Sequence, residues 1–313
     1  MDIDIVIPYV DGSDLQWREG FEKILQLEQE KTKQDPSIEP HGIEEDKFRS
    51  FDTFRYLLRG IECCCPWIRR IYIVIQQPSQ KPSWLKECGN LKIIYHKDII
   101  PQEYLPTYNS ATIEMFVWKI KGLSEHFIYI NDDTFPINPL TKDMFFTKKG
   151  YPKINLWTKK QSIIEGHAQM LKNSEMAAII ASGNDCVWEP DVCLKDSHTW
   201  TPMKRSIWKI LFEEVGDMIY SSLTTFRNSK NIVQQISTYY FWFVNKYKPA
   251  ENINVKNCNF LECSVTDIMK YIIEHKYDII CINDFGVKDY ESTKRAITNA
   301  FFAIFPNKSQ FEI

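Results

Sequence analysis

Residues 127–133 read Phe-Ile-Tyr-Ile-Asn-Asp-Asp, an apolar run that passes directly into three polar residues. A short run rich in Ile and aromatic residues, bounded by Asn and Asp, is typical of a buried strand that ends at a polar edge of a sheet. Three similar runs precede it along the chain, at Ile3–Ile7, Ile71–Ile75 and Leu91–Tyr95. Together with Phe127–Ile130 they predict four strands of one sheet.

Helical patterns separate several of these strands. Ser50 is a candidate cap for a helix over residues 51–62, and Ser110 for a helix that buries Ile113, Phe116, Val117 and Ile120. Strands that alternate with helices predict a mostly parallel, Rossmann-like α/β sheet flanked by helices. The polar stretch 28–47, with two Pro, is predicted to be an exposed insertion.

The second half of the chain is predicted to be helix-rich and packed on the sheet. The expected elements are a helix within 161–182 that ends near Ser182-Gly183, a helix that starts at Thr201-Pro202, helices from about Ser229 and over Ser264–His275, and a strand over Tyr277–Ile282. We expect one catalytic domain over 1–313, with an α/β half at 1–150 and a helix-rich half at 151–313 that completes the site.

Composition sets limits on function and location. The 313 residues are 44% hydrophobic and 25% charged, which excludes a wholly disordered chain. A net charge of -3 provides no bulk field for nucleic acid, so no nucleic-acid partner is expected. No run approaches 18 apolar residues, and no secretory signal pattern follows Met1, so no transmembrane segment is expected. Nine Cys without CxxC pairs or regular spacing favour reduced thiols in the cytoplasm.

Each predicted strand is followed at once by polar residues. These clusters are Asp11-Gly-Ser-Asp14, Gln76-Gln77, His96-Lys-Asp98 and Asn131-Asp-Asp133. The carboxyl ends of parallel strands meet at one edge of a sheet, where α/β proteins bind ligands. The pattern therefore predicts one site built from several strand ends.

Asp132 and Asp133 are the sharpest element of that site. Two adjacent carboxylates at a strand end suit Mg²⁺ or Mn²⁺, which prefer oxygen ligands. Asn and Asp are also common turn residues, so a simple turn remains the alternative for this pair.

Charged residues on the predicted helices give further candidates. Asp52, Arg55 and Arg59 would share one face of the 51–62 helix, where the two guanidiniums suit a phosphate; the alternative is a surface ion pair. Glu114 is either solvated or reaches the strand edge. His198 and Arg227 each precede a predicted helix start, where anions bind, although a lone His is more often structural.

One competing motif is present at the N-terminus. Asp2-Ile-Asp4-Ile-Val6 matches the DxDx[TV] pattern of haloacid-dehalogenase-type phosphatases. In those enzymes the Asp pair follows its strand, whereas here it precedes one, which disfavours the phosphatase interpretation.

Four blocks in order resemble the Stealth family of hexose-1-phosphate transferases, which includes bacterial capsular polysaccharide phosphotransferases. The blocks are Ile3–Asp14, Phe51–Pro139, His198–Tyr240 centred on Phe226-Arg-Asn-Ser-Lys-Asn231, and Ile282-Asn-Asp284 with Phe305–Glu312. They cover well over half of the chain.

The resemblance implies a GT-A-like fold and transfer of a sugar-1-phosphate from a UDP-sugar donor to a glycan or lipid-linked glycan acceptor, with release of UMP. It implies Mg²⁺ (or Mn²⁺) as cofactor, held by Asp132, Asp133 and Asp284. The implied catalytic residues are Glu114, Asp133, His198 and Arg227. The implied substrate-binding residues are Asp11, Gly12, Asp14, Arg55, Arg59, Asn109, Ser110, Asn131 and Asn283.

Two other functions stay open at this point. An ordinary GT-A glycosyltransferase would release UDP in place of UMP, and a non-catalytic sugar-nucleotide or glycan-binding protein would use the aromatic residues as its platform. We expect a cytoplasmic location, with peripheral association at the inner face of the membrane as a further option.

Overall fold

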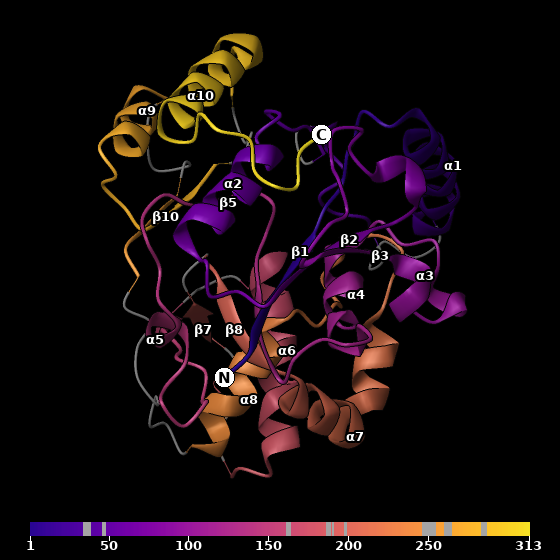
Figure 1. The fold of residues 1–313 in the computed structure, drawn as a ribbon. Helices are drawn as coiled ribbons and strands as arrows, with labels where there is room; N and C mark the ends of the chain where they lie inside the picture. The colour runs from indigo at the N-terminus through magenta and orange to yellow at the C-terminus, as the bar shows by residue number, and fades with distance from the viewer. Residues whose placement is uncertain are drawn as a thin grey trace.

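The computed structural model describes residues 1–33, 39–45, 48–160, 164–185, 189, 191–196, 199–245, 255–259, 265–282 and 287–313. A five-stranded sheet in the order β3-β2-β1-β4-β8 lies at its centre (Figure 1). Its parallel strands are β1 (Ile3–Pro8), β2 (Arg70–Ile75), β3 (Leu91–Tyr95) and β4 (His126–Tyr129). Strand β8 (Thr201–Lys204) pairs antiparallel with β4. The mostly parallel α/β sheet and its four predicted strands are confirmed.

Alternate side chains of the central strands face two separate cores. Ile3, Ile5 and Ile7 point to the core covered by α2 (Phe54–Cys64), α9 (Val265–Ile273) and α10 (Tyr290–Ile304). Val6 and its neighbours on the other strands point to the opposite core. That core is covered by α4 (Ser110–Glu114), α6 (His167–Ser182), α7 (Arg205–Ser222) and α8 (Gln235–Val244). Figure 1 shows the two groups of helices on opposite sides of the sheet. Residues from both halves of the chain contribute to both cores.

Two small sheets complete the strands. One has the order β5-β10-β9, formed by β5 (Thr134–Pro136), β10 (Ile279–Cys281) and β9 (Asn257–Asn259). The other is an antiparallel pair of β6 (Leu156–Lys160) and β7 (Val192–Asp196). The remaining helices are α1 (Leu15–Thr32), α3 (His96–Ile99), α5 (Lys142–Phe145) and the 3₁₀ turns η3 (Pro78–Gln80), η4 (Gln102–Tyr104) and η5 (Val117–Lys119).

The helix expected over 51–62 begins later, at Phe54. Asp52 lies outside it with a φ of 57°, and its carboxylate pairs with Lys294. The Ser50 hydroxyl accepts the amide of Asp52 and does not cap the helix. The prediction that Asp52, Arg55 and Arg59 share one helical face is therefore wrong for Asp52.

The helix expected after Ser110 is short. Asn109 caps it, because its side chain accepts the amide of Ala111, and the helix ends at Glu114. The chain then turns through η5, and Phe116, Val117 and Ile120 are all buried as expected.

The helix start expected at Thr201-Pro202 is wrong. These residues lie in β8, and the helix begins at Arg205. Strand β8 is at the end of the sheet order, where a Pro is tolerated because its missing amide faces away from the ladder. Helix α6 ends at Ser182 as expected, with Gly183 in the left-handed region, and α9 lies within the expected Ser264–His275. The helix expected from about Ser229 begins only at Gln235.

The polar stretch 28–47 is only partly an exposed insertion. Helix α1 continues to Thr32, and the amide of His41 donates to the carbonyl of Arg227 at 2.7 Å. Residues 34–38 and 46–47 lie outside the described part of the chain.

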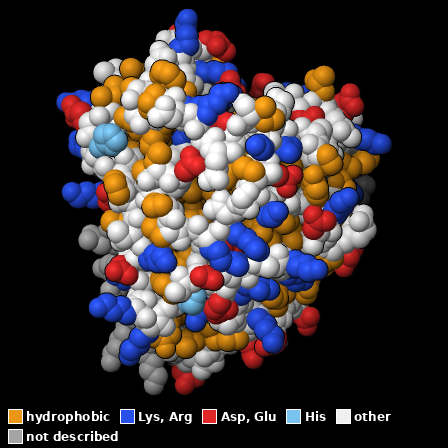
Figure 2. All heavy atoms as spheres, viewed as in Figure 1, with side chains coloured by type: hydrophobic (Ala, Val, Ile, Leu, Met, Phe, Trp, Pro, Cys, Tyr) orange, Lys and Arg blue, Asp and Glu red, His pale blue; other side chains and the backbone are white. Residues whose placement is uncertain are grey.

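Two expectations from composition concern the thiols and membranes. Cys63, Cys64, Cys65, Cys88, Cys193 and Cys281 are free thiols. Within the described ranges, no helix combines the length and apolarity that a bilayer-spanning segment requires. On the face seen in Figure 2, acidic and basic side chains are interspersed.

A buried ion pair fastens the C-terminal segment to α2. Arg59 donates through Nε and Nη2 to the two carboxylate oxygens of Glu312, both at 2.7 Å, and through Nη1 to the carbonyl of Phe305. The side chains of Arg59 and Glu312 are 7% and 2% exposed. Burial alone would raise the pKa of Glu312, but hydrogen bonds from Arg59 and Ser309 hold the pKa below its ordinary value.

Replacing Glu312 by Ala should lower the free energy of unfolding by about 3–5 kcal/mol, because it leaves the Arg59 guanidinium buried without its partner. Since the pKa of Glu312 is lowered, this stabilisation is present at neutral pH and is lost as the pH falls through that pKa. Urea denaturation at pH 7 measures the loss. The exposed neighbour Gln310→Ala is the control, and equal midpoints for the two variants would contradict the assignment.

Candidate active site

The carboxyl ends of β1, β2 and β4 bring their polar residues together at one edge of the sheet. The amide of Val10, after β1, donates to the carboxylate of Asp132, after β4. Tyr9 is the residue before Val10. Burial, together with the charges of Asp11 and Asp132, raises the pKa of the Tyr9 hydroxyl. The predicted convergence of strand ends is therefore confirmed for these three strands.

The end of β3 does not contribute in the expected way. His96 is 5% exposed and begins α3, where burial lowers its pKa to about 4. Asp98 accepts the amide of Tyr95 and closes the turn. This cluster is structural in the fold, because it ends the strand and starts a helix.

Asp132 and Asp133 form the acidic centre of the edge. Burial, with a smaller contribution from the charge of Asp133, raises the pKa of Asp132 to about 7. The carboxylate of Asp133 accepts a hydrogen bond from the Cys281 thiol at 3.5 Å. The backbone carbonyl of Asp133 accepts one from the amide of Ile282 at 2.8 Å. Asn131 is half-buried beside them, and its carbonyl accepts the hydroxyl of Thr134.

The acids after β1 mainly hold the local backbone. Asp14 caps α1 and accepts hydrogen bonds from Ser79 and Gln80 at 2.6 and 2.7 Å, and these bonds lower its pKa although burial would raise it. Asp11 accepts the amide and hydroxyl of Ser13. A Cβ on Gly12 would lie 2.4 Å from the carbonyl oxygen of Phe48, so only Gly fits this crossing of two segments.

Glu114 is buried on the β4 side of the edge, at 8% exposure. Its Oε1 accepts the hydroxyl of Tyr129 at 3.3 Å and its Oε2 accepts the amide of Gln234 at 3.1 Å. Burial raises the pKa of Glu114, and the nearby charge of Arg227 opposes that rise. Of the two options that the sequence left open, Glu114 reaches the site.

Arg227 reaches the same place from a loop in the second half of the chain. Its guanidinium donates to the hydroxyl of Ser110, the first residue of α4. Arg227 does not precede a helix directly as expected, because α8 begins only at Gln235. The structure therefore brings Arg227, from a loop, to Ser110 and Glu114 of α4.

Asn109 fixes this loop. It is fully buried, and its Nδ2 donates to the carbonyls of Thr224 and Phe226 and to Oδ1 of Asn231 at 3.1–3.3 Å. Asn231 in turn donates to the carbonyl of Ser222 at 2.6 Å. In this geometry Asn109 holds the Arg227 loop against α4 and does not face an open cavity.

The two arginines of α2, Arg55 and Arg59, have different partners. The three donor groups of Arg59 are used by Glu312 and Phe305, so in this arrangement it binds the protein's own C-terminal segment. Arg55 is half-buried and stacks over the ring of Trp84, with 5.2 Å between the guanidinium carbon and the ring centroid.

Three of the predicted site residues, His198, Asn283 and Asp284, lie outside the described residues. Within the described ranges, no group of three or more His, Cys, Asp and Glu side chains is arranged to hold a metal. Asp132 and Asp133 are the predicted ligands that the structure does describe.

Sequence reasoning missed Tyr129, Gln234 and Asp4 as participants in local structure. Tyr129 was assigned only to a strand, although its position beside the strand-end acids was a usable signal. Asp4, from the competing phosphatase motif, is buried inside β1 and accepts both Arg69 and the amide of Ser124. Asp4 and Arg69 therefore form a structural ion pair.

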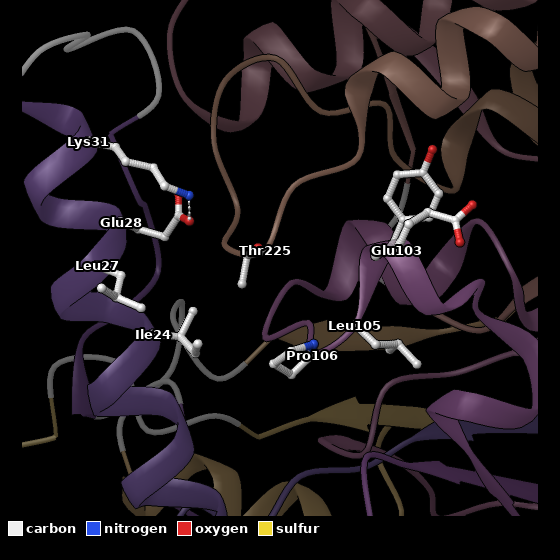
Figure 3. A pocket seen from close by; sticks show the side chains of 9 residues that line it. Ile24, Leu27, Glu28, Lys31, Glu103, Leu105, Pro106 and Thr225 are labelled. Atoms are coloured by element: carbon white, nitrogen blue, oxygen red, sulfur yellow. Dashed lines mark hydrogen bonds and ion pairs between the residues drawn. The ribbon is translucent and has the colours of Figure 1, made fainter.

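A groove of about 450 Å³ is lined in part by Thr225, two residues before Arg227. Figure 3 shows Ile24 and Leu27 of α1 on one wall, Leu105 and Pro106 on the other, and Thr225 between them. An ion pair between Glu28 and Lys31 borders it. None of the predicted site residues lines this groove.

Comparison with known proteins finds a family match within the chain. Residues 47–154 match the family model described as Stealth protein CR2, conserved region 2. This span contains α2, the strands β2 to β4 and the acids that follow β4. Over this region the chain therefore resembles the Stealth family.

Similar proteins extend the match beyond that region. They include "Receptor polysaccharide phosphotransferase WefC" of Streptococcus gordonii, 29% identical, and "Capsular polysaccharide phosphotransferase WcwK" of Streptococcus pneumoniae, 28% identical; each alignment covers 99% of both chains. "Exopolysaccharide phosphotransferase cps2G" of Lactiplantibacillus plantarum is 27% identical over 99% of this chain and 96% of its own. The galactosyltransferase LgtC, solved with donor and acceptor sugar analogues, aligns over 95% of both chains at 10% identity and a TM-score of 0.36, too low to support an argument.

Asp132→Asn should stabilise the protein at alkaline pH. The raised pKa means that the folded state is stabilised while Asp132 is protonated and loses that contribution as the pH rises through about 7. Thermal denaturation in EDTA at pH 8 should therefore show the variant melting a few degrees above the wild type, with a smaller difference at pH 5. Asp217→Asn on the exposed face of α7 is the control and should show no gain at either pH.

Asn109→Ala should release the Arg227 loop. The carbonyls of Thr224 and Phe226 keep hydroxyl donors from Thr112 and Thr224, so the cost is the loss of the Asn109 bonds, at about 0.5–1.5 kcal/mol each. Chemical denaturation should show a loss of that order, and limited proteolysis should cut within 222–234 faster than in the wild type. Thr225→Ala, whose side chain takes no part in this network, should behave as the wild type; identical cleavage of Asn109→Ala would count against the loop-holding role.

Proposed function

We propose that the protein transfers a sugar-1-phosphate from a UDP-sugar to a hydroxyl of a glycan acceptor and releases UMP. The observation that carries this proposal is that Tyr129 binds the buried Glu114 and is close enough to Arg227 and the strand-end Asp132 to feel both charges, while Ser110 holds Arg227. Phosphoryl transfer needs charge neutralisation and in-line positioning more than covalent catalysis by the protein. The relatives' names, which describe polysaccharide phosphotransferases, support the same class of reaction.

In this reaction the acceptor oxygen attacks phosphorus and not the anomeric carbon. The new bond joins the acceptor oxygen to the phosphorus that carries the sugar, and the bridging oxygen of the diphosphate leaves with UMP. The anomeric carbon keeps its bond to oxygen, so its configuration is retained without a carboxylate nucleophile. An ordinary glycosyltransferase would break the bond at that carbon and release UDP.

The guanidinium of Arg227 would bind the transferred phosphoryl group, since Arg presents several donors to phosphate oxygens. Glu114 would keep Arg227 in place through its charge, and Tyr129 and Gln234 hold the Glu114 carboxylate by hydrogen bonds. Ser110 fixes the other side of the guanidinium. Arg55 and Asn131 would contact the donor at the same edge, as the family resemblance implies.

The strand-end carboxylates fit a divalent cation. The charge of Asp133 contributes to the raised pKa of Asp132, and a bound cation would relieve this repulsion. Asp132 and Asp133, with Asp284 by resemblance, would hold Mg²⁺ or Mn²⁺, which supplies charge neutralisation for the diphosphate when bound.

The proton of the acceptor hydroxyl requires a base. The resemblance assigns His198 either this role or that of a hydrogen-bond donor to the phosphate. If His198 is the base, kcat/KM falls as the pH drops and His198 becomes protonated. If His198 is a hydrogen-bond donor, it is active in its protonated form, and kcat/KM falls as the pH rises.

The product identifies the reaction. With Mg²⁺, a panel of UDP-sugars and a glycan acceptor, we expect UMP and a phosphodiester-linked sugar, and release of UDP would refute the proposal. Arg227→Ala, Asp133→Asn and His198→Ala should each lower kcat by about 100-fold or more, because each removes a group that acts on the reacting phosphate. Lys230→Ala, an exposed cation in the same loop, is the matched control and should keep the wild-type kcat.

A further inference from the structure

Strands β6 and β7 pair as an antiparallel ribbon, which we call the β6–β7 hairpin although α6 lies between the two strands in the chain. Its two strands carry Lys159, Lys160 and Lys195 but, as their one acid, Asp196, whereas the whole chain has a net charge of -3. Trp157 is 47% exposed in the middle of β6. An exposed indole among cations on a two-stranded hairpin is an unusual surface for a purely structural element.

Three side chains of the hairpin share one face. Trp157 and Lys159 are two residues apart on β6, so they project to the same side. The strand register places Lys195 of β7 directly opposite Trp157. We call Trp157, Lys159 and Lys195 the hairpin face. Neither Lys159 nor Lys195 forms an ion pair with a described carboxylate, whereas Lys160 pairs with Asp191 at 3.0 Å.

The hairpin leads to the active site. Its inner end is the pair Leu156 and Asp196, and the charge of Asp196 contributes to the raised pKa of Glu114. Lys160 lies four residues further along β6, about 13 Å away at the usual rise of a strand. A linear ligand lying along the hairpin would therefore point towards Glu114 and Arg227.

A small cavity lies at that inner end. Its volume is about 20 Å³, enough for one water or one hydroxyl group, and Lys153, Asp196, Thr199 and Thr238 are among its lining residues. The hydroxyl oxygens of Thr199 and Thr238 are buried and make no hydrogen bond, and Thr238 is only 6% exposed. Buried hydroxyls without partners are costly, so this cavity is suited to a polar group of a ligand.

We propose that the hairpin face and this cavity bind the acceptor, and that the acceptor is a glycan chain that already carries phosphodiesters. This rests on the proposed function, because each transfer adds one negative phosphodiester to the product. The ring of Trp157 stacks on a sugar, Lys159 and Lys195 pair with the phosphodiester charges, and a hydroxyl near the chain end enters the cavity. An anionic bilayer would match the charge but would leave the two buried hydroxyls without a partner.

Binding can be tested without turnover. The probe is a phosphomannan oligosaccharide that carries mannosyl phosphodiesters, compared by calorimetry with the same oligosaccharide after removal of its phosphate, on the full chain. We expect the charged probe to bind at least about tenfold more tightly and to weaken as salt is added. The double variant Lys159→Glu/Lys195→Glu should remove about tenfold of the affinity for the charged probe only, and Trp157→Ala should weaken both probes equally.

The matched control is Lys121→Glu, an exposed cation in the loop before β4. Equal affinity for the two probes, or double-variant binding equal to that of Lys121→Glu, would overturn the proposal. So would loss of binding to phosphatidylglycerol vesicles in the double variant with oligosaccharide affinity unchanged, since the face would then contact a membrane. A UMP assay that fails while charged-probe binding follows the expected pattern would refute the proposed reaction and leave the binding site standing.

Discussion

The buried amide of Asn109 is the interaction on which the geometry of the site depends. It joins the start of α4 to a loop more than 110 residues further along the chain, by donating to two carbonyls and one side-chain oxygen. The loop from Leu223 to Gln234 contains no helix or strand, so its backbone groups need partners from elsewhere. Because one side chain satisfies several of them at once, the loop has one favoured position, and that position brings Arg227 to Ser110.

The direction of each pKa shift separates two kinds of acid in this protein. The pKa values of Asp14 and Glu312 are lowered, because hydrogen bonds or an Arg partner more than offset burial. The pKa values of Asp132 and Glu114 are raised, because burial is not fully compensated. Lowered values mark acids that stabilise the fold, and raised values mark acids that the fold holds in an unfavourable environment. Functional sites are where such environments are retained.

Local pattern was sufficient for the elements whose signal is contained within a few residues. The four central strands were predicted because each is a continuous apolar run, and the convergence of their ends followed from the geometry of a parallel sheet. The pattern failed where the deciding partner is distant. Arg59 was assigned to the donor site because nothing near it in sequence reveals Glu312, which is 253 residues away. Thr201-Pro202 was assigned to a helix because a Pro after Thr resembles a helix start, whereas the edge of the sheet tolerates the same Pro in a strand.

The same distant pairing explains why the site needs the second half of the chain. Parallel strand ends deliver acids and turn residues to the edge, but they bring no cation to balance Glu114, and Arg227 reaches it only from the loop before α8. Strand β8 makes this possible, because it pairs with β4 and so attaches the second half beside the strand that carries Asp132 and Asp133. From there, the charge of Asp196 at the end of β7 acts on Glu114, and the residue before α8, Gln234, supplies its amide. One antiparallel strand pairing therefore places the cation, the buried acid and the β6–β7 hairpin around a common point.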